Sequence, residues 1–119
     1  INSNVTKEPI EQVEVVGAKN NYSGSVNEWL LALRTCETHS NYTANTGNGF
    51  YGAYQFMIGT WDNIARKTGR TDLVGLRPDL ANPADQDAMV IANTNMTAGL
   101  STQHPGCYAK LGLSNKPPQ

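Results

Sequence analysis

Apolar residues recur at helical spacing just after residue 25, on what would be one face of an α-helix. Val26, Trp29, Leu30 and Leu33 form this stripe. The segment 25–28, Ser-Val-Asn-Glu, has the serine and glutamate of a capping box, in which each side chain accepts a hydrogen bond from the other residue's backbone. The pattern therefore predicts a helix that begins near residue 26.

Two further helices are predicted downstream. Thr60 can cap one that runs to about Thr68 and stops at Gly69. Asn82-Pro83 suits the cap and first turn of the other, which Gly99 ends. The expected apolar sides are Trp61, Ile64 and Ala65 in the first of these helices, and Ala88, Ile91, Ala92 and Met96 in the second.

The two ends of the chain differ from this helical part. The valine-rich segment 10–16 predicts one short strand, which needs partners to be stable, and residues 18–25 resemble a polar linker. Residues 114–119 are expected to form a flexible tail. The predicted organisation is thus a strand and linker over 1–25, one folded domain over 26–113, and a tail.

A run rich in glycine, amide and aromatic residues fills positions 45–56. Its first part, 45–49, has the glycines and asparagines typical of turns. Its second part alternates weakly and predicts a short hairpin strand or an extended loop, with Tyr51 and Gln55 on one face. Such side chains suit a sugar-binding cleft, but a hairpin whose aromatic residues belong to the core fits the pattern equally well.

Composition narrows the classes of function. The 119 residues, with 39% hydrophobic and 16% charged side chains and a net charge of -1, indicate one small domain without the basic excess of a nucleic-acid binder. No apolar run reaches the roughly 18 residues of a membrane span. No signal peptide is visible, but the chain also lacks a starting Met, so a removed export signal stays open. A neutral glycan is a compatible ligand.

The two cysteines, Cys36 and Cys107, leave two interpretations open. They form a disulfide if the protein is exported, or they remain buried thiols in a reducing compartment. With His39 and His104 they show none of the paired spacings of a zinc site, so no metal and no cofactor are expected. Nucleophilic catalysis by Cys36 with either histidine would need a free thiolate, which a disulfide forbids.

Glu37 is the candidate catalytic residue. At 100° per residue it projects between Leu30 and Leu33, inside the apolar stripe, and is expected to face a cleft wall rather than bulk water. A carboxylic acid held against apolar surface can keep its proton near neutral pH and donate it to a leaving group. The alternative is an exposed glutamate at a frayed helix end.

Glycoside hydrolysis usually needs a second carboxylate. The remaining candidates, which have simpler explanations in helix first turns or loops, are Asp62, Asp72, Asp79, Asp85 and Asp87. One acid suffices if an N-acetyl sugar supplies its own acetamide and the muramyl 6-hydroxyl attacks within the substrate. Glu37 would then act first as acid and afterwards as base.

Several stretches resemble the catalytic domain of resuscitation-promoting factors. They are Cys36-Glu37 with the following residues to Tyr42, the run Asn45-Thr46-Gly47-Asn48-Gly49-Phe50-Tyr51-Gly52, Gln55-Phe56, Thr60-Trp61, Arg77-Pro78-Asp79-Leu80 and the late Cys107. The resemblance covers about residues 26–108. It implies a mostly helical α+β domain, lysozyme-like, with a short hairpin or extended loop beside the cleft and one Cys36–Cys107 disulfide.

The resemblance also implies roles. Glu37 would be the catalytic acid, and the substrate-binding residues would be Gln55, Thr60, Tyr51, Tyr42 and Asn48. It implies a secreted or cell-wall-associated monomer that acts on bacterial peptidoglycan strands and promotes resuscitation from dormancy, with other cell-wall hydrolases as candidate partners. Residues 5–19 resemble the last strand of a G5 domain, a module that often precedes this catalytic domain.

Three departures from the family's pattern concern the cleft. The residues after Glu37 are Thr38 to Tyr42 instead of two glycines and a tryptophan, Met57 replaces a polar residue, and the segment 100–105 lacks the expected tryptophans. The resulting hypothesis is a muralytic enzyme that cleaves the β-1,4 bond between N-acetylmuramic acid and N-acetylglucosamine, by lytic transglycosylation more than by lysozyme-type hydrolysis. The alternative is a non-catalytic wall-binding or signalling module.

Overall fold

The first helix, α1, spans Val26–Thr38 in a computed structural model that describes residues 22–119. Its predicted capping box is confirmed: the Ser25 backbone N–H donates to Glu28 Oε1 at 2.7 Å, and the Glu28 N–H donates to Ser25 Oγ at 3.1 Å. The predicted apolar stripe is confirmed as well, because the buried residues of α1 are Trp29, Leu30 and Leu33. The strand predicted over 10–16 and the G5-like stretch lie outside the described residues.

The second helix, α2, spans Ile58–Lys67. Its predicted start at Thr60 is wrong by a few residues, because Met57 occupies the cap position in extended conformation without a side-chain cap bond. Tertiary packing replaces the cap: Phe56, just before the helix, packs edge-on against Trp61 with 5.2 Å between ring centroids. The predicted apolar side, Trp61, Ile64 and Ala65, is buried as expected. The short helix η1, Thr71–Leu73, follows.

The third helix, α3, spans Pro83–Met96 after the short helix η2, Pro78–Leu80. Asn82 caps α3 as predicted, with its side chain accepting the Asp85 N–H at 3.0 Å. The predicted core face is confirmed in part: Ile91 and Ala92 pack partly buried against the core, but Ala88 and Met96 are exposed. The fully buried residues are Gln86, Met89, Val90, Asn93 and Thr94. Apolarity did not predict the buried Gln86, Asn93 and Thr94, which are polar and have hydrogen-bond partners.

The last helices are α4, Leu100–Gln103, and α5, Pro105–Leu111. The segment after them was expected to be a flexible tail, but it is hydrogen-bonded to the domain. Trp29 Nε1–H donates to the Ser114 carbonyl at 2.9 Å. The Leu100 N–H donates to the Asn115 carbonyl at 2.9 Å, and Asn115 Nδ2 donates to the Ala98 carbonyl at 2.8 Å. These bonds close the end of the chain over α1 and the start of α4.

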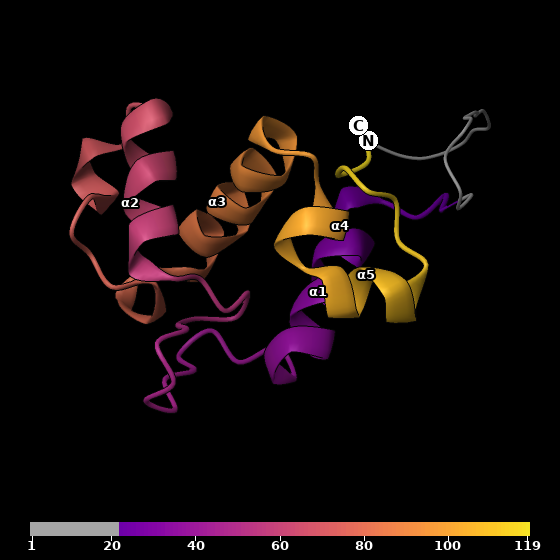
Figure 1. Ribbon diagram of the computed structural model, residues 1–119, viewed down its shortest axis with the longest axis horizontal. Helices are drawn as coiled ribbons and strands as arrows, with labels where there is room; N and C mark the ends of the chain where they lie inside the picture. The colour runs from indigo at the N-terminus through magenta and orange to yellow at the C-terminus, as the bar shows by residue number, and fades with distance from the viewer. Residues whose placement is uncertain (1–21) are drawn as a thin grey trace.

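The helices form two groups around one core (Figure 1). Helices α2 and α3 lie side by side, while α5 packs against both α1 and α4. In the view of Figure 1, the irregular segment between α1 and α2 runs from the end of α1 to a position below α2 and α3. The buried apolar side chains form a single cluster that both groups share, with Trp29, Tyr54 and Trp61 among its largest members. This arrangement confirms the expected small, mostly helical domain.

The segment between α1 and α2 is an extended loop rather than a hairpin of strands. Within residues 22–119 its only β pairing consists of two isolated bridges, in which Tyr51 pairs with Asn45 on one side and with Phe56 on the other. Ala53, Tyr54 and Phe56 are buried and belong to the core, as one of the two open interpretations held. The loop thus brings its remaining polar and aromatic residues to the surface beside α1.

Candidate active site

Glu37 lies in the last turn of α1, which remains helical to Thr38. His39 caps the helix in left-handed conformation, with φ 57°. The Thr38 hydroxyl, next to Glu37, donates to the Ala53 carbonyl at 2.9 Å and ties the helix end to the loop. The Glu37 side chain is 19% exposed. The frayed, solvent-exposed glutamate considered above therefore does not describe this residue.

The partner of Glu37 comes from the far end of the chain. Nδ1 of His104 lies 3.0 Å from Oε2 of Glu37. His104 joins α4 to α5, and its own side chain is only 7% exposed. The contact is a hydrogen bond in any protonation state that places one proton between the two atoms. It is an ion pair when the imidazole is protonated and the carboxyl group is not.

A pocket of about 500 Å³ opens beside this pair. Glu37 and His104 line it together with a disulfide, an aromatic ring, two amides and one lysine. The full lining is Cys36, Glu37, Phe50, Gln55, Gln103, His104, Pro105, Gly106, Cys107 and Lys110. A concave site with a few converging polar groups is the usual form of a small-ligand or glycan subsite.

The disulfide Cys36–Cys107 links the two elements that carry the pair. Cys36 precedes Glu37 on α1, and Cys107 lies on α5, within one turn of His104. The bridge spans a sequence separation of 71 residues, with 6.0 Å between the Cα atoms. It confirms the pairing implied by the resemblance and decides between the two interpretations of the cysteines. It also keeps α5 against α1, where the pocket lies.

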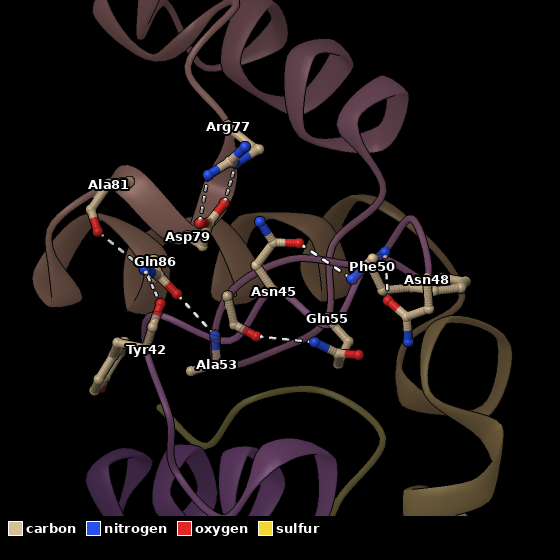
Figure 2. Close-up of polar contacts among 12 residues, drawn as sticks. Tyr42, Asn45, Asn48, Phe50, Ala53, Gln55, Arg77, Asp79, Ala81 and Gln86 are labelled. Atoms are coloured by element: carbon tan, nitrogen blue, oxygen red, sulfur yellow. Dashed lines mark hydrogen bonds and ion pairs between the residues drawn. The ribbon is translucent and has the colours of Figure 1, made fainter.

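The loop wall of the pocket is held by Gln86, whose side chain is buried under the loop (Figure 2). Gln86 Nε2 donates to the Tyr42 and Ala81 carbonyls, each at 2.9 Å, and Oε1 accepts the Ala53 N–H at 2.9 Å. Gly52 must remain small here, because a Cβ at this position would come within 2.5 Å of Gln86 Oε1. One amide thus fixes both ends of the loop against α3.

Of the predicted substrate-binding residues, only Gln55 lines this pocket with Glu37. Its φ of 57° is in the left-handed region that non-glycine residues rarely adopt, and its Nε2 donates to the Gly52 carbonyl at 3.2 Å. The strand alternation that would place Tyr51 and Gln55 on one face is therefore wrong. Tyr51 instead packs against Arg77, whose guanidinium carbon lies 5.4 Å from the ring centroid.

The other three predicted residues lie outside the pocket lining. The Tyr42 hydroxyl donates to Asp87 Oδ1 at 2.7 Å. Asn48 Oδ1 accepts the Phe50 N–H at 3.0 Å and shapes the turn that presents the Phe50 ring (Figure 2). Thr60 lies in the first turn of α2. Their roles toward a longer substrate stay predictions.

Glu37 is the single carboxylate in the pocket lining, because every other acid weighed above has a partner elsewhere in the described residues. Asp62 accepts the Gly75 N–H. Arg70 binds Asp72 and Asp85, and its hydrogen bond lowers the pKa of the Asp72 carboxyl group. The two remaining contacts join Asp79 to Arg77 and Asp87 to tyrosine hydroxyls.

Sequence reasoning considered His104 only with the cysteines and did not place it beside Glu37, although a signal was present. If Cys36 and Cys107 pair, Glu37, next to Cys36, and His104, three residues before Cys107, are brought into the same region. Phe50, Gln103 and Lys110 were also not proposed as site residues.

Within residues 22–119, no three side chains of metal-binding type gather closely enough to hold an ion. No helix in that range has the length and apolarity to cross a membrane.

Comparison with known proteins was consistent with this geometry. Residues 24–107 match the family described as "Transglycosylase-like domain". The chain is 31% identical over 88 residues to resuscitation-promoting factor Rpf1 of Corynebacterium glutamicum, an alignment that covers 73% of this chain and 42% of that protein. It is 37% identical over 79 residues to RpfD of Mycobacterium tuberculosis, covering 66% and 42%. The chain thus spans less than half the length of these relatives.

Proposed function

Because the chain belongs to the transglycosylase-like domain family, we propose that it is a peptidoglycan glycosidase. The bond it cleaves is the β-1,4 linkage between N-acetylmuramic acid and N-acetylglucosamine, with Glu37 as catalytic acid. The curated relatives are named resuscitation-promoting factors, which supports a role in wall remodelling during resuscitation. The disulfide is typical of exported proteins and supports action at the cell wall.

The observation that carries the mechanism is the single carboxylate in the pocket. Enzymes that hydrolyse glycosides with two carboxylates place them about 5 to 10 Å apart across the scissile bond. Among the described residues, the pocket lining offers Glu37 and no second acid. This composition favours lytic transglycosylation, in which the substrate supplies the second reacting group.

The reaction would proceed in two proton transfers. Glu37 donates its proton to the glycosidic oxygen as the C1–O bond breaks, and the bonding electron pair leaves with that oxygen. The 2-acetamido group stabilises the cationic C1. The muramyl 6-hydroxyl then attacks C1 while the Glu37 carboxylate accepts its proton, which gives a 1,6-anhydro end and restores the acid.

The remaining polar and aromatic residues of the pocket suit glycan binding. The Gln55 amide and the partly exposed Phe50 ring lie in the same pocket as Glu37. A sugar presents an apolar face to an aromatic ring and hydroxyl groups to amides, so these two residues suit one subsite. Tyr51, Thr60, Tyr42 and Asn48 are proposed to contact more distant parts of the strand.

The deciding experiment is mass spectrometry of fragments released from purified peptidoglycan. Wild type is expected to release anhydro-muramyl ends, and Glu37→Gln to release none, because an amide cannot donate the proton. Glu28→Gln is the matched control, since it makes the same chemical change on the same helix, outside the pocket, and glutamine preserves a capping box. Reducing ends would indicate hydrolysis. No fragments from wild type would indicate a non-catalytic wall-binding module.

A further inference from the structure

We propose that His104 is a positioning residue for Glu37, a role that rests on the proposed function. Its imidazole binds Oε2 of the carboxyl group and leaves Oε1 as the oxygen that exchanges protons with the glycan.

The imidazole is held in place from several sides. The His104 N–H donates to the Leu100 carbonyl at 2.8 Å, and the His104 carbonyl accepts the Tyr108 N–H at 2.9 Å. The disulfide at Cys107 anchors the following turn to α1. With only 7% of its side chain exposed, His104 has little freedom to leave the 3.0 Å contact with Glu37.

The two carboxyl oxygens of Glu37 have different surroundings. Oε2 contacts His104 Nδ1, whereas Oε1 has no hydrogen-bond partner among residues 22–119. An Nδ1–H that donates to Oε2 directs the acidic proton to Oε1. If the proton sat on Oε2, it would point at Nδ1 and be withheld from the substrate. His104 keeps its own proton in both steps, so the proton count of the reaction is unchanged.

The contact predicts that the pH dependence of kcat involves His104 as well as Glu37. Apart from Lys110, the other residues lining the pocket are uncharged: Phe50, Gln55, Gln103, Pro105, Gly106 and the non-titrating disulfide. A change in the pH profile on substitution of His104 is therefore attributed to its contact with Glu37.

The test compares three variants on soluble, uncrosslinked glycan strands. His104→Ala is expected to lower kcat by about 10- to 100-fold with KM within about twofold, because a misplaced acid costs rate rather than binding. His104→Asn retains an N–H donor near the Nδ1 position and is expected to recover kcat to within about tenfold of wild type. Its pH profile should lose one ionisation, because an amide does not titrate.

His39→Asn is the matched control, since it replaces the other histidine outside the pocket and asparagine tolerates left-handed backbone. It should leave kcat and the pH profile unchanged. An active wild type whose pH profile is unchanged in His104→Asn would overturn the inference, as would equal kcat loss in His104→Asn and His104→Ala. An inactive wild type would instead refute the proposed function. Urea unfolding of each variant separates these effects from loss of fold.

Discussion

Two carboxylates of this domain lie in contrasting surroundings. Asp87 on α3 accepts the hydroxyls of Tyr42 and Tyr54 on one oxygen, at 2.7 Å and 2.6 Å. Arg34 joins the same cluster, with its guanidinium carbon 5.3 Å from the Tyr42 ring centroid. Glu37 lies one turn after Arg34 on α1, lines a pocket, and has one side-chain partner, His104, within residues 22–119.

The difference shows what distinguishes a structural carboxylate from a reactive one. The hydroxyls on Asp87 cannot leave without exposing buried polar groups, so that cluster stabilises the packing of the loop on α3. Burial and the hydrogen bonds to Asp87 raise the pKa values of Tyr42 and Tyr54 above the usual value for tyrosine. Glu37 keeps one oxygen that has no partner among the described residues, as a group that exchanges protons with a substrate must.

The contrast is tested most directly by changing each carboxylate to its amide. Glu37→Gln should lower the cleavage rate by about 10²- to 10⁴-fold, the usual contribution of a general acid. Asp87→Asn should leave the rate within about threefold of wild type and lower the free energy of unfolding by about 1–3 kcal/mol, because one buried hydrogen-bond network is weakened. Rates on purified peptidoglycan and urea unfolding measure both effects. Equal rate losses in Glu37→Gln and Asp87→Asn would contradict the distinction between a reactive and a structural carboxylate.

Removing the disulfide should loosen the contact between α1, which carries Glu37, and α5, which follows His104. Cys36→Ala combined with Cys107→Ala is expected to lower the free energy of unfolding by about 2–5 kcal/mol, as expected for so long a closed loop. Activity should fall with it, because α5 is no longer covalently held against α1. Dithiothreitol should reproduce the loss in wild type and have no effect on the double variant. A double variant with wild-type unfolding and activity would contradict this role.

The anchor of the loop wall can be removed without touching the pocket lining. Gln86→Met has nearly the same shape but leaves the Ala53 N–H and two backbone carbonyls without their partner. We expect a loss of about 1–3 kcal/mol in the free energy of unfolding, the usual cost of buried unpaired polar groups. Asn63→Ala, at an exposed amide of α2, is the control and should change it by less than about 0.5 kcal/mol. Similar urea unfolding midpoints for Gln86→Met and Asn63→Ala would show that Gln86 does not anchor the loop.

Alkaline pH should destabilise the fold through its buried tyrosines. A tyrosine whose pKa is raised by folding stabilises the protein below its unfolded pKa of about 10, and this contribution is lost as pH rises further. Tyr54 and Tyr42 fit this case, and burial together with Glu28 raises the pKa of Tyr22 to about 12. Urea midpoints should therefore decline as the pH rises from about 10 to about 12. A Tyr54→Phe variant with the same decline as wild type would contradict the role of that residue.

Local features of the chain were predicted well, and the reason is visible in particular residues. The capping box of α1, the Asn82 cap of α3 and the placement of Glu37 between Leu30 and Leu33 depend on neighbours within a turn or two. The prediction of the buried face of α3 was incomplete because Gln86 and Asn93 are buried with hydrogen-bond partners elsewhere in the chain. These partners include the Tyr42 carbonyl and the Gln103 side chain. Apolarity carries no information on such partners.

The sequence by itself determined the helices α1, α2 and α3, the phase that turns Glu37 inward, and the presence of two cysteines able to pair, whereas α4 and α5 were not predicted. These properties follow from backbone geometry and side-chain chemistry over short distances. Only the tertiary structure decided that Glu37 meets His104, that Tyr42 binds Asp87, and that the loop forms bridges instead of strands. The Glu37–His104 and Tyr42–Asp87 contacts join residues 67 and 45 positions apart along the chain, and the packing of the whole core determines whether they form.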